Sequence, residues 1–257
     1  MGETPVNVEF LLILIGLLLV ATLYSSVGHG GASGYLAVLS LTSYGVMESS
    51  WLKQQVWCLN LVVASIAFYH YRKSGHHNPK LTLPFIAASI PFALLGGYMI
   101  VDGGAYDVLL SIALLWAAWR LFWVKSDIPE DSLEPVELKS ALPVGGVIGL
   151  VSGIVGVGGG IFLSPVLLLK RWATPKVAAA TAALFIWVNS MAGLVGAGLS
   201  RQLDLDILVL APFTLVVLIG GILGSRYGSD IAPQQLVKKL LVAVLVIAAV
   251  KRLLEMV

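Results

Sequence analysis

Two glycine-rich stretches decide the fold of this chain, Val27-Gly28-His29-Gly30-Gly31-Ala32 and Val155-Gly156-Val157-Gly158-Gly159-Gly160. Each lies inside an apolar segment that is long enough to enter a bilayer. Clustered glycines interrupt a helix, and non-helical backbone at membrane depth is tolerated only where protein buries it or where it lines a cavity. Paired interruptions in corresponding halves of a chain are typical of a binding site inside a membrane protein.

The composition indicates a membrane protein. Of the 257 residues, 58% are hydrophobic and 12% are charged, and the mean hydropathy is +0.92, which is more apolar than a soluble domain needs. The net charge of +2 is too small and too scattered for nucleic-acid binding. The single cysteine, Cys58, excludes an intramolecular disulfide. Because Glu3 stands where a signal peptide has basic residues, we expect the first apolar run to remain in the mature protein.

The apolar runs divide the chain into two similar halves. They lie at about 8–27, 33–45, 54–70, 81–101, 106–124, 140–157, 161–170, 177–197, 207–225 and 236–254. A spanning helix needs about 17–25 apolar residues, so several of these runs are long enough. The most polar stretch separates the halves. We therefore predict a membrane repeat at residues 1–124, a polar linker at 125–139 and a second membrane repeat at 140–257.

The halves share landmarks in one order at nearly one offset. A shift of 128 residues pairs Gly28 with Gly156, Gly30 with Gly158, Gly31 with Gly159, Pro84 with Pro212, Gly96 with Gly224 and Asp102 with Asp230. A shift of 129 residues pairs Asn60 with Asn189. This agreement predicts an internal repeat, although glycine is common in membrane helices and single identities carry little weight.

Basic residues predict that the two repeats are inverted, because cytoplasmic loops carry the excess of lysine and arginine. Where a loop of one half carries an excess of lysine and arginine, the equivalent loop of the other half has few or none. If each glycine stretch is the apex of a hairpin that returns to its own side, and three spans follow it, twelve of the 16 basic residues are cytoplasmic. A model with four crossings per half places only nine inside. Lys251 and Arg252, at the external C-terminus of the inverted model, count against it.

The predicted fold class is therefore all-α, a polytopic membrane protein with two inverted repeats. Each repeat is a glycine-broken helical hairpin followed by three spanning helices. We expect a multi-pass protein of the cell inner membrane, with both termini external and the central linker cytoplasmic. The lipid bilayer is the expected partner, and the sequence leaves the oligomeric state open.

This arrangement resembles the sulfite exporter TauE/SafE family of membrane permeases. The resemblance covers nearly the whole chain and rests on both glycine motifs, on Ser164-Pro165 with the run to Leu169, and on Thr174-Pro175 leading into Ala178–Thr181. It implies secondary transport of a small sulfur-containing anion such as sulfite, sulfoacetate or a sulfonate, by export or by uptake, with ion or proton coupling. The two halves differ at two equivalent positions: His29 corresponds to Val157, and Ala37 corresponds to Pro165.

A small anion in a bilayer needs stabilisation, and no lysine or arginine occurs at mid-span. A helix N-terminus offers free N–H groups and about half a positive charge. We expect the helices that begin near Ala32 and Ile161 to point such ends at the anion. The predicted substrate-binding residues are Gly28, His29, Gly30, Gly31, Ser33, Asn60, Gly156, Gly158, Gly159, Gly160 and Asn189. Ser25, Ser26 and Ser152 are further hydroxyl candidates.

Each of these residues also has a structural interpretation. The glycines would equally let helices pack closely. His29 is the one ionisable side chain at a predicted break, so it either carries a proton or assists the anion, or it is a neutral histidine bonded to a backbone carbonyl. Asn60 and Asn189 either donate to an oxyanion or hold a broken-helix carbonyl.

Two other functions remain open on the sequence. An anion channel cannot be separated from a carrier. Gly31-Ala32-Ser33-Gly34 matches the pattern of rhomboid-type intramembrane serine proteases, with His70 as the candidate base. We nevertheless predict that the chain is not an enzyme. The sequence contains no phosphate-binding loop, and we expect neither a cofactor nor a metal ion.

Overall fold

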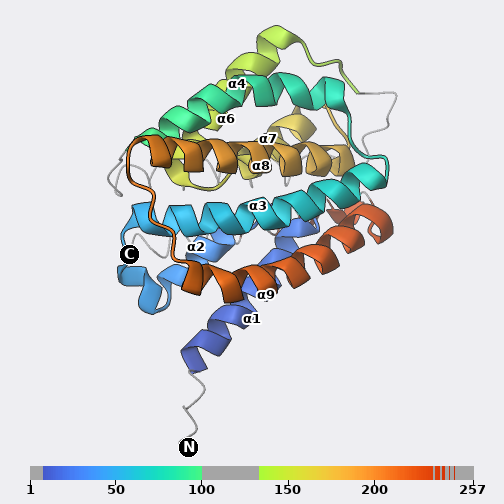
Figure 1. Ribbon diagram of the computed structural model, residues 1–257. Helices are drawn as coiled ribbons and strands as arrows, with labels where there is room; N and C mark the ends of the chain where they lie inside the picture. The colour runs from blue at the N-terminus through green and yellow to red at the C-terminus, as the bar shows by residue number, and fades with distance from the viewer. Residues whose placement is uncertain are drawn as a thin grey trace, which may run out of the picture.

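The computed structural model describes residues 8–99 and 133–233, together with residues 235–237, 239, 240, 243 and 246. The described part is helical and has no strand, so the all-α prediction is confirmed. The elements are α1 (Val8–Ser25), α2 (Ala32–Ser40), η1 (Ser43–Val46), α3 (Ser49–Lys73), α4 (Pro79–Tyr98), α6 (Leu138–Val155), α7 (Gly160–Leu169), α8 (Pro175–Leu199), α9 (Ile207–Arg226) and η3 (Tyr227–Ile231) (Figure 1). Five helices in this part are long and apolar enough to cross a membrane: α1, α4, α6, α8 and α9 continued into η3.

The helices of the two halves correspond in length and in their starting signals. α1 and α6 have 18 residues each, α3 and α8 have 25 each, and α4 and α9 have 20 each. α4 and α9 also begin in the same way. The Asn78 side chain accepts hydrogen bonds from two amides of the first turn of α4, and the Asp206 side chain does the same for α9. Such N-caps satisfy donors that a helix start leaves unpaired.

Both glycine-broken hairpins return to the end at which they start. In the first, the Ser43 amide, just after α2, donates to the Glu9 carboxylate at the start of α1 (2.6 Å). In the second, the Glu134 amide, just before α6, donates to the Arg171 carbonyl just after α7 (2.9 Å). The chain therefore enters and leaves each hairpin on one side.

Equivalent long helices run in opposite directions. At one end of α3, Gln54 Nε2 donates to the carbonyl of Gln202, which follows the last turn of α8 (2.7 Å). At the other end, Lys176 Nζ in the first turn of α8 and His76 Nε2 beyond the last turn of α3 both donate to the Ser229 carbonyl, at 2.9 and 3.3 Å. α3 and α8 are thus antiparallel neighbours, as Figure 1 shows. Their direction supports the predicted inversion of the repeats.

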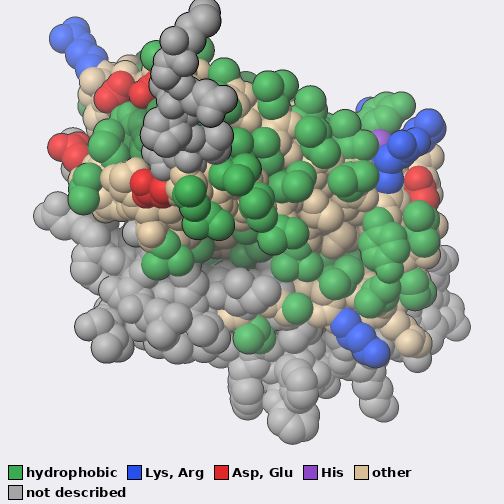
Figure 2. All heavy atoms as spheres, turned by 90° about the horizontal axis from the view of Figure 1, so that it is seen from below, with side chains coloured by type: hydrophobic (Ala, Val, Ile, Leu, Met, Phe, Trp, Pro, Cys, Tyr) green, Lys and Arg blue, Asp and Glu red, His purple; other side chains and the backbone are tan. Residues whose placement is uncertain are grey.

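The halves are packed into each other. α1 lies on α9, and α6 lies on α4, so the first helix of each half contacts the last described long helix of the other half. α3 also packs on α9, and α8 packs on α4. On the outside, Figure 2 shows a broad belt of hydrophobic side chains, with charged side chains toward its ends. Leu12, Leu19, Leu208, Leu215 and Leu223 of α1 and α9 are more than half exposed, as expected for a surface that faces lipid.

Two boundaries differ from the sequence prediction, and several predictions lie outside the described residues. α3 begins at Ser49, before the predicted run at 54–70, because its polar first turns pack against the α8–α9 connection. α6 begins at Leu138, inside the predicted linker. The runs at 106–124 and most of 236–254, residues 125–132 of the linker and both chain ends lie outside the part that the structure describes.

Candidate functional site

The two glycine breaks end in short helices that start without a side-chain cap. Gly31 precedes α2 with φ of 102°, and Gly159 precedes α7 with φ of 78°. Both angles are left-handed and favour glycine, because a Cβ there meets the backbone. Neither N-cap provides a side-chain hydrogen bond, so the first-turn amides of two buried helices have no cap to accept from them. A buried, uncapped helix start has positive character and suits an anion.

The breaks meet at a cluster between α3 and α8, which we call the central cluster: Gly30, Asn60, Gly158, Gly160, Ile186 and Ser190. A Cβ at Gly30 would lie 2.3 Å from Asn60 Oδ1 and 3.1 Å from Ile186 Cγ2. A Cβ at Gly158 would lie 2.8 Å from the same Ile186 methyl and 3.1 Å from Asn60 Nδ2. Gly160 also packs against Ile186. The two interruptions, about half the chain apart in sequence, are therefore neighbours in space.

Asn60 and Asn189 are fully buried amides with unused hydrogen-bonding capacity. Asn60 Nδ2 donates to Ser190 Oγ across the α3–α8 contact at 3.4 Å, and its Oδ1 has no hydrogen-bond partner among the residues that the structure describes. In the described part of the chain, neither amide atom of Asn189 has a hydrogen-bond partner. A buried polar group without a partner costs about 1–3 kcal/mol. Neither asparagine holds a broken-helix carbonyl, which was one of its two predicted roles.

His29 joins the two hairpins. Its side chain is 2% exposed, and Nε2 is 2.9 Å from the hydroxyl of Ser164 in α7. The imidazole also lies against the backbone of Gly160, the first residue of α7. A residue of the first break is thus bonded to the helix that begins at the second break, directly beside the central cluster.

The serines have different partners. Ser33 Oγ is 2.9 Å from Tyr24 Oη, and the predicted protease base, His70, bonds Ser225 instead through Nδ1 (2.7 Å). A serine nucleophile needs its base within hydrogen-bonding reach, so the geometry disfavours the protease alternative. Ser25 and Ser26 donate to backbone carbonyls, as helix-end serines often do. Ser152 is fully buried and borders Gly159, and its hydroxyl has no hydrogen-bond partner within residues 8–99 and 133–233.

α3 fixes the position of both hairpins. Tyr71 Oη, near its C-terminal end, donates to the Ser26 carbonyl at the end of α1 (2.5 Å). Lys53 Nζ, near its N-terminal end, donates to the Ile154 carbonyl at the end of α6 (3.0 Å). A basic group at a helix C-terminus offsets the partial negative charge there. With Asn60 between these two anchors, one helix sets the spacing of the two breaks.

The structure brings some of the predicted residues together and separates others. Gly30, Asn60, Gly158 and Gly160 form the central cluster, and His29 borders it. The other glycines contact different groups, since Gly28 packs on the Ala179 backbone, Gly31 on the Tyr35 ring and Gly156 on the Lys53 side chain. Ser164, Ser190 and Ile186 were not predicted as site residues. Ser190 follows Asn189 directly, and Ser164 belongs to the Ser-Pro motif, so the sequence carried a signal for both.

The comparisons with known proteins match one family model and several membrane transporter proteins. The family model described as "Sulfite exporter TauE/SafE" matches residues 12–252. A probable membrane transporter protein of Sinorhizobium fredii is 32% identical over 231 residues, which cover 86% of this chain and 90% of that protein. Probable membrane transporter proteins of Methanocaldococcus jannaschii and Bacillus subtilis are each 27% identical, over 73% and 65% of this chain and the same shares of their own length. No solved structure matches the chain significantly.

Proposed function

Since the chain belongs to the sulfite exporter TauE/SafE family of membrane transporters, we propose that it is a secondary transporter of a small sulfur-containing anion, such as sulfite, sulfoacetate or a sulfonate. The observation that carries this proposal is the contact of both glycine breaks with Asn60 and Ile186. Two uncapped helix starts then lie near one buried amide, Asn60, and a second buried amide, Asn189, directly precedes Ser190 of the cluster on α8.

The chemistry of this position suits transport of a small anion. No residue of the central cluster carries a permanent charge, so the anion is held by amide dipoles and helix ends, and release is not prevented by a buried ion pair. Glycine leaves room for the backbone to approach the ligand. We infer that the cluster and His29 form the substrate site, with the repeats inverted so that it opens to each side in turn.

The direct test is a binding screen of the purified protein against sulfite, sulfoacetate, taurine and aryl sulfonates. We expect saturable binding of at least one of these anions, and saturable flux in vesicles. Failure of all four to bind would remove the proposal, and flux that rises linearly with substrate would favour the channel alternative.

Replacing Asn189 by leucine separates a ligand role from a structural role. The change removes two buried polar atoms for which the described residues provide no hydrogen-bond partner. We therefore expect the unfolding free energy of the unliganded protein to rise by about 1–3 kcal/mol, while anion affinity falls by about tenfold or more. Thermal unfolding and equilibrium binding measure the two effects.

A matched control for this variant is Thr181→Val. Thr181 is equally buried on α8, but its hydroxyl bonds Thr82 at 3.1 Å outside the central cluster. Its removal leaves Thr82 without that partner, so stability falls and anion affinity stays the same. Unchanged affinity in Asn189→Leu would argue against Asn189 as a ligand.

We propose that His29 couples transport to protons, and His29→Gln tests this role. A glutamine amide can reach Ser164 as Nε2 does, but it does not titrate near neutral pH. If His29 takes up a proton with the anion, wild-type affinity rises as the pH falls from about 8 to about 5.5, and His29→Gln loses this rise. Ser164→Ala keeps the imidazole, so this variant retains the rise in affinity at low pH. A full pH effect in His29→Gln would refute the coupling role.

A further inference from the structure

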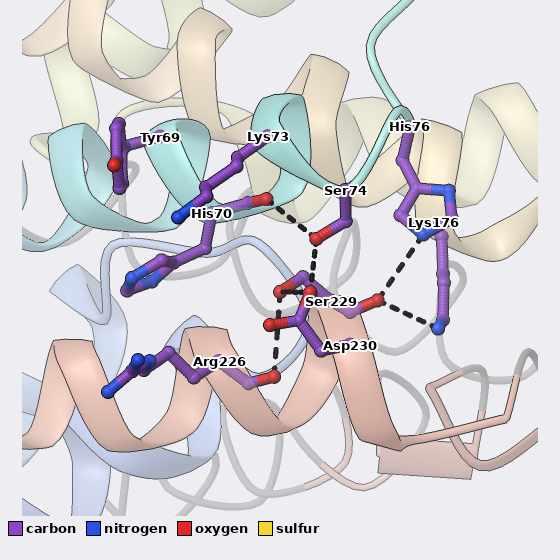
Figure 3. A pocket seen from close by; sticks show the side chains of 9 residues that line it. All are labelled: Tyr69, His70, Lys73, Ser74, His76, Lys176, Arg226, Ser229 and Asp230. Atoms are coloured by element: carbon purple, nitrogen blue, oxygen red, sulfur yellow. Dashed lines mark hydrogen bonds between the residues drawn. The ribbon is translucent and has the colours of Figure 1, made fainter.

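A second polar region lies away from the central cluster, at the end of the molecule where α3 and α9 finish and α8 begins. It is a pocket of about 530 Å³, which we call the α3–α9 pocket, lined by Tyr69, His70, Lys73, Ser74, His76, Lys176, Arg226, Ser229 and Asp230 (Figure 3). Three of these nine residues are permanently cationic, and one is acidic. This pocket is large enough for an oxyanion with part of its hydration shell.

The positive charge of the pocket is only partly neutralised within it. Asp230 accepts hydrogen bonds from the hydroxyls of Ser74 and Ser229. Within the described residues, neither Lys73 nor Arg226 has a carboxylate within ion-pairing distance, and Lys73 Nζ lies 5.9 Å from the centre of the Tyr69 ring. In Figure 3 the side chains of His70, Lys73 and Arg226 extend to the same side of the pocket. The positive charges of Lys73 and Arg226 disfavour protonation of the His70 imidazole while the pocket is empty of an anion.

The hydrogen bonds of His70 determine which of its nitrogens a ligand can use. Ser225 Oγ donates its one proton to the Gly221 carbonyl (2.5 Å), so it must accept from His70 Nδ1 at 2.7 Å. The Nδ1–H group therefore donates to Ser225, and Nε2 is the ring nitrogen that a ligand in the pocket can contact. Neutral Nε2 is an acceptor and repels an oxyanion, whereas the protonated ring donates to it. The groups that face this ring are Tyr69 and Lys73 of α3, Ser225 and Arg226 of α9, and Asp230 of η3, whereas Lys176 lines the opposite side of the pocket (Figure 3).

We propose that the α3–α9 pocket is a second anion site, which binds an oxyanion of the sulfate or phosphate class through Lys73, Arg226 and protonated His70. Guanidinium, ammonium and imidazolium groups together are the donors that such oxyanions require. The anion is either free in solution or the headgroup phosphate of an anionic lipid. Binding is linked to proton uptake by His70, so affinity rises as the pH falls. This inference does not depend on the substrate of the central cluster.

Inorganic sulfate is a suitable probe, because it remains a dianion across the pH range in which histidine titrates. Sulfate binding to the purified full-length protein is measured by equilibrium dialysis at about pH 5.5 and about pH 8. The measurements are made in wild type and in Asn189→Leu, whose substitution directly precedes Ser190 of the central cluster and is expected to weaken anion binding there. We expect saturable binding in both proteins, tighter at the lower pH. Loss of sulfate binding in Asn189→Leu with the α3–α9 pocket intact would place the sulfate in the central cluster and overturn the inference.

Three substitutions in the pocket and one matched control define the site. Lys73→Gln and Arg226→Gln remove exposed cations, so the fold is retained, and each should weaken sulfate binding about tenfold. His70→Asn keeps a donor for Ser225 and removes Nε2, so the pH dependence disappears. Arg72→Gln is the control, because Arg72 is exposed on the same turn of α3 but does not line the pocket. Arg72 instead acts on His77, whose pKa is lowered by burial and, to a smaller extent, by the Arg72 charge. The control substitution should change sulfate affinity by no more than about twofold.

The source of the anion is tested in nanodiscs of phosphatidylcholine with and without phosphatidylglycerol. If phosphatidylglycerol displaces sulfate from wild type but not from Lys73→Gln, the natural occupant is a lipid headgroup. If phosphatidylglycerol does not displace sulfate from wild type, the natural occupant is a soluble anion. Both results support the site. Equal sulfate affinity in wild type, Lys73→Gln and Arg226→Gln, or no saturable binding together with no preference for the anionic lipid, would overturn it.

Discussion

Gly28→Ala is expected to abolish the folded protein rather than only its activity. Gly28 has φ of 75°, and a Cβ there would lie 2.1 Å from the Ala179 carbonyl oxygen. The left-handed angle costs an alanine about 1–2 kcal/mol, and the clash is with the backbone of α8, which cannot move aside like a side chain. We expect a total loss of about 4 kcal/mol or more, a large part of the stability of a typical domain. Thermal unfolding of the purified protein, followed by size-exclusion chromatography, measures the loss.

Gly75→Ala is the matched control for this prediction. Gly75 has nearly the same left-handed angle, φ of 79°, but apart from its two chain neighbours no atom of the described residues lies within 4 Å of a Cβ added there. Its replacement should cost only the backbone strain of about 1–2 kcal/mol. The difference in unfolding free energy between the two variants therefore measures the contact of the first glycine break with α8. Equal stability of the two alanine variants would show that this contact is not rigid.

Gly30→Ala has the largest expected effect on anion binding. Gly30 does not have a positive φ, so alanine is tolerated by the backbone. Its Cβ would instead lie 2.3 Å from Asn60 Oδ1, and the amide must move out of the central cluster. We expect anion affinity to fall by about tenfold to a hundredfold, which corresponds to a lost charge-assisted hydrogen bond of about 1.5–3 kcal/mol. Equilibrium binding of the anion identified in the screen measures the effect.

Gly198→Ala controls for the loss of a glycine as such. Gly198 lies on α8, and outside its own helix backbone and chain neighbours no described atom lies within 4 Å of a Cβ added there. Alanine is the better helix former by about 1 kcal/mol, so stability rises slightly and affinity is unchanged. Wild-type affinity in Gly30→Ala would mean that the position of Asn60 is not used by the anion, and the central cluster would then be a packing contact only.

The sequence predicted the organisation of the fold well because that organisation depends on local signals. Apolar run length marked the spanning helices, and clustered glycines marked the breaks before α2 and α7. The prediction was weaker for α3. Its first turns contain Lys53, Gln54 and Gln55, and they are helical because these side chains bond α6 and the α8–α9 connection. Such partners lie about 100 to 150 residues away and leave no periodic signal in the chain.

The candidate site was predicted in type but not in composition. The repeat offset identified Asn60 and Asn189 as equivalent, but it did not indicate that Asn60 meets Gly30 and Gly158. His29 was recognised as the ionisable residue at a break, whereas its partner Ser164 lies 135 residues further along the chain. The α3–α9 pocket was missed altogether, because its cations come from three helices and each is unremarkable in its own sequence context.

By itself, the sequence determined the class of the protein and the places where helices stop, since hydropathy, proline and glycine act on the backbone nearby. The tertiary structure decided which groups those breaks face. Antiparallel packing of α3 and α8 brings two distant glycine loops to one asparagine, and it collects basic side chains at one end of the molecule. The physical reason is that side-chain packing between distant segments is a property of the whole folded chain, and no local pattern specifies it.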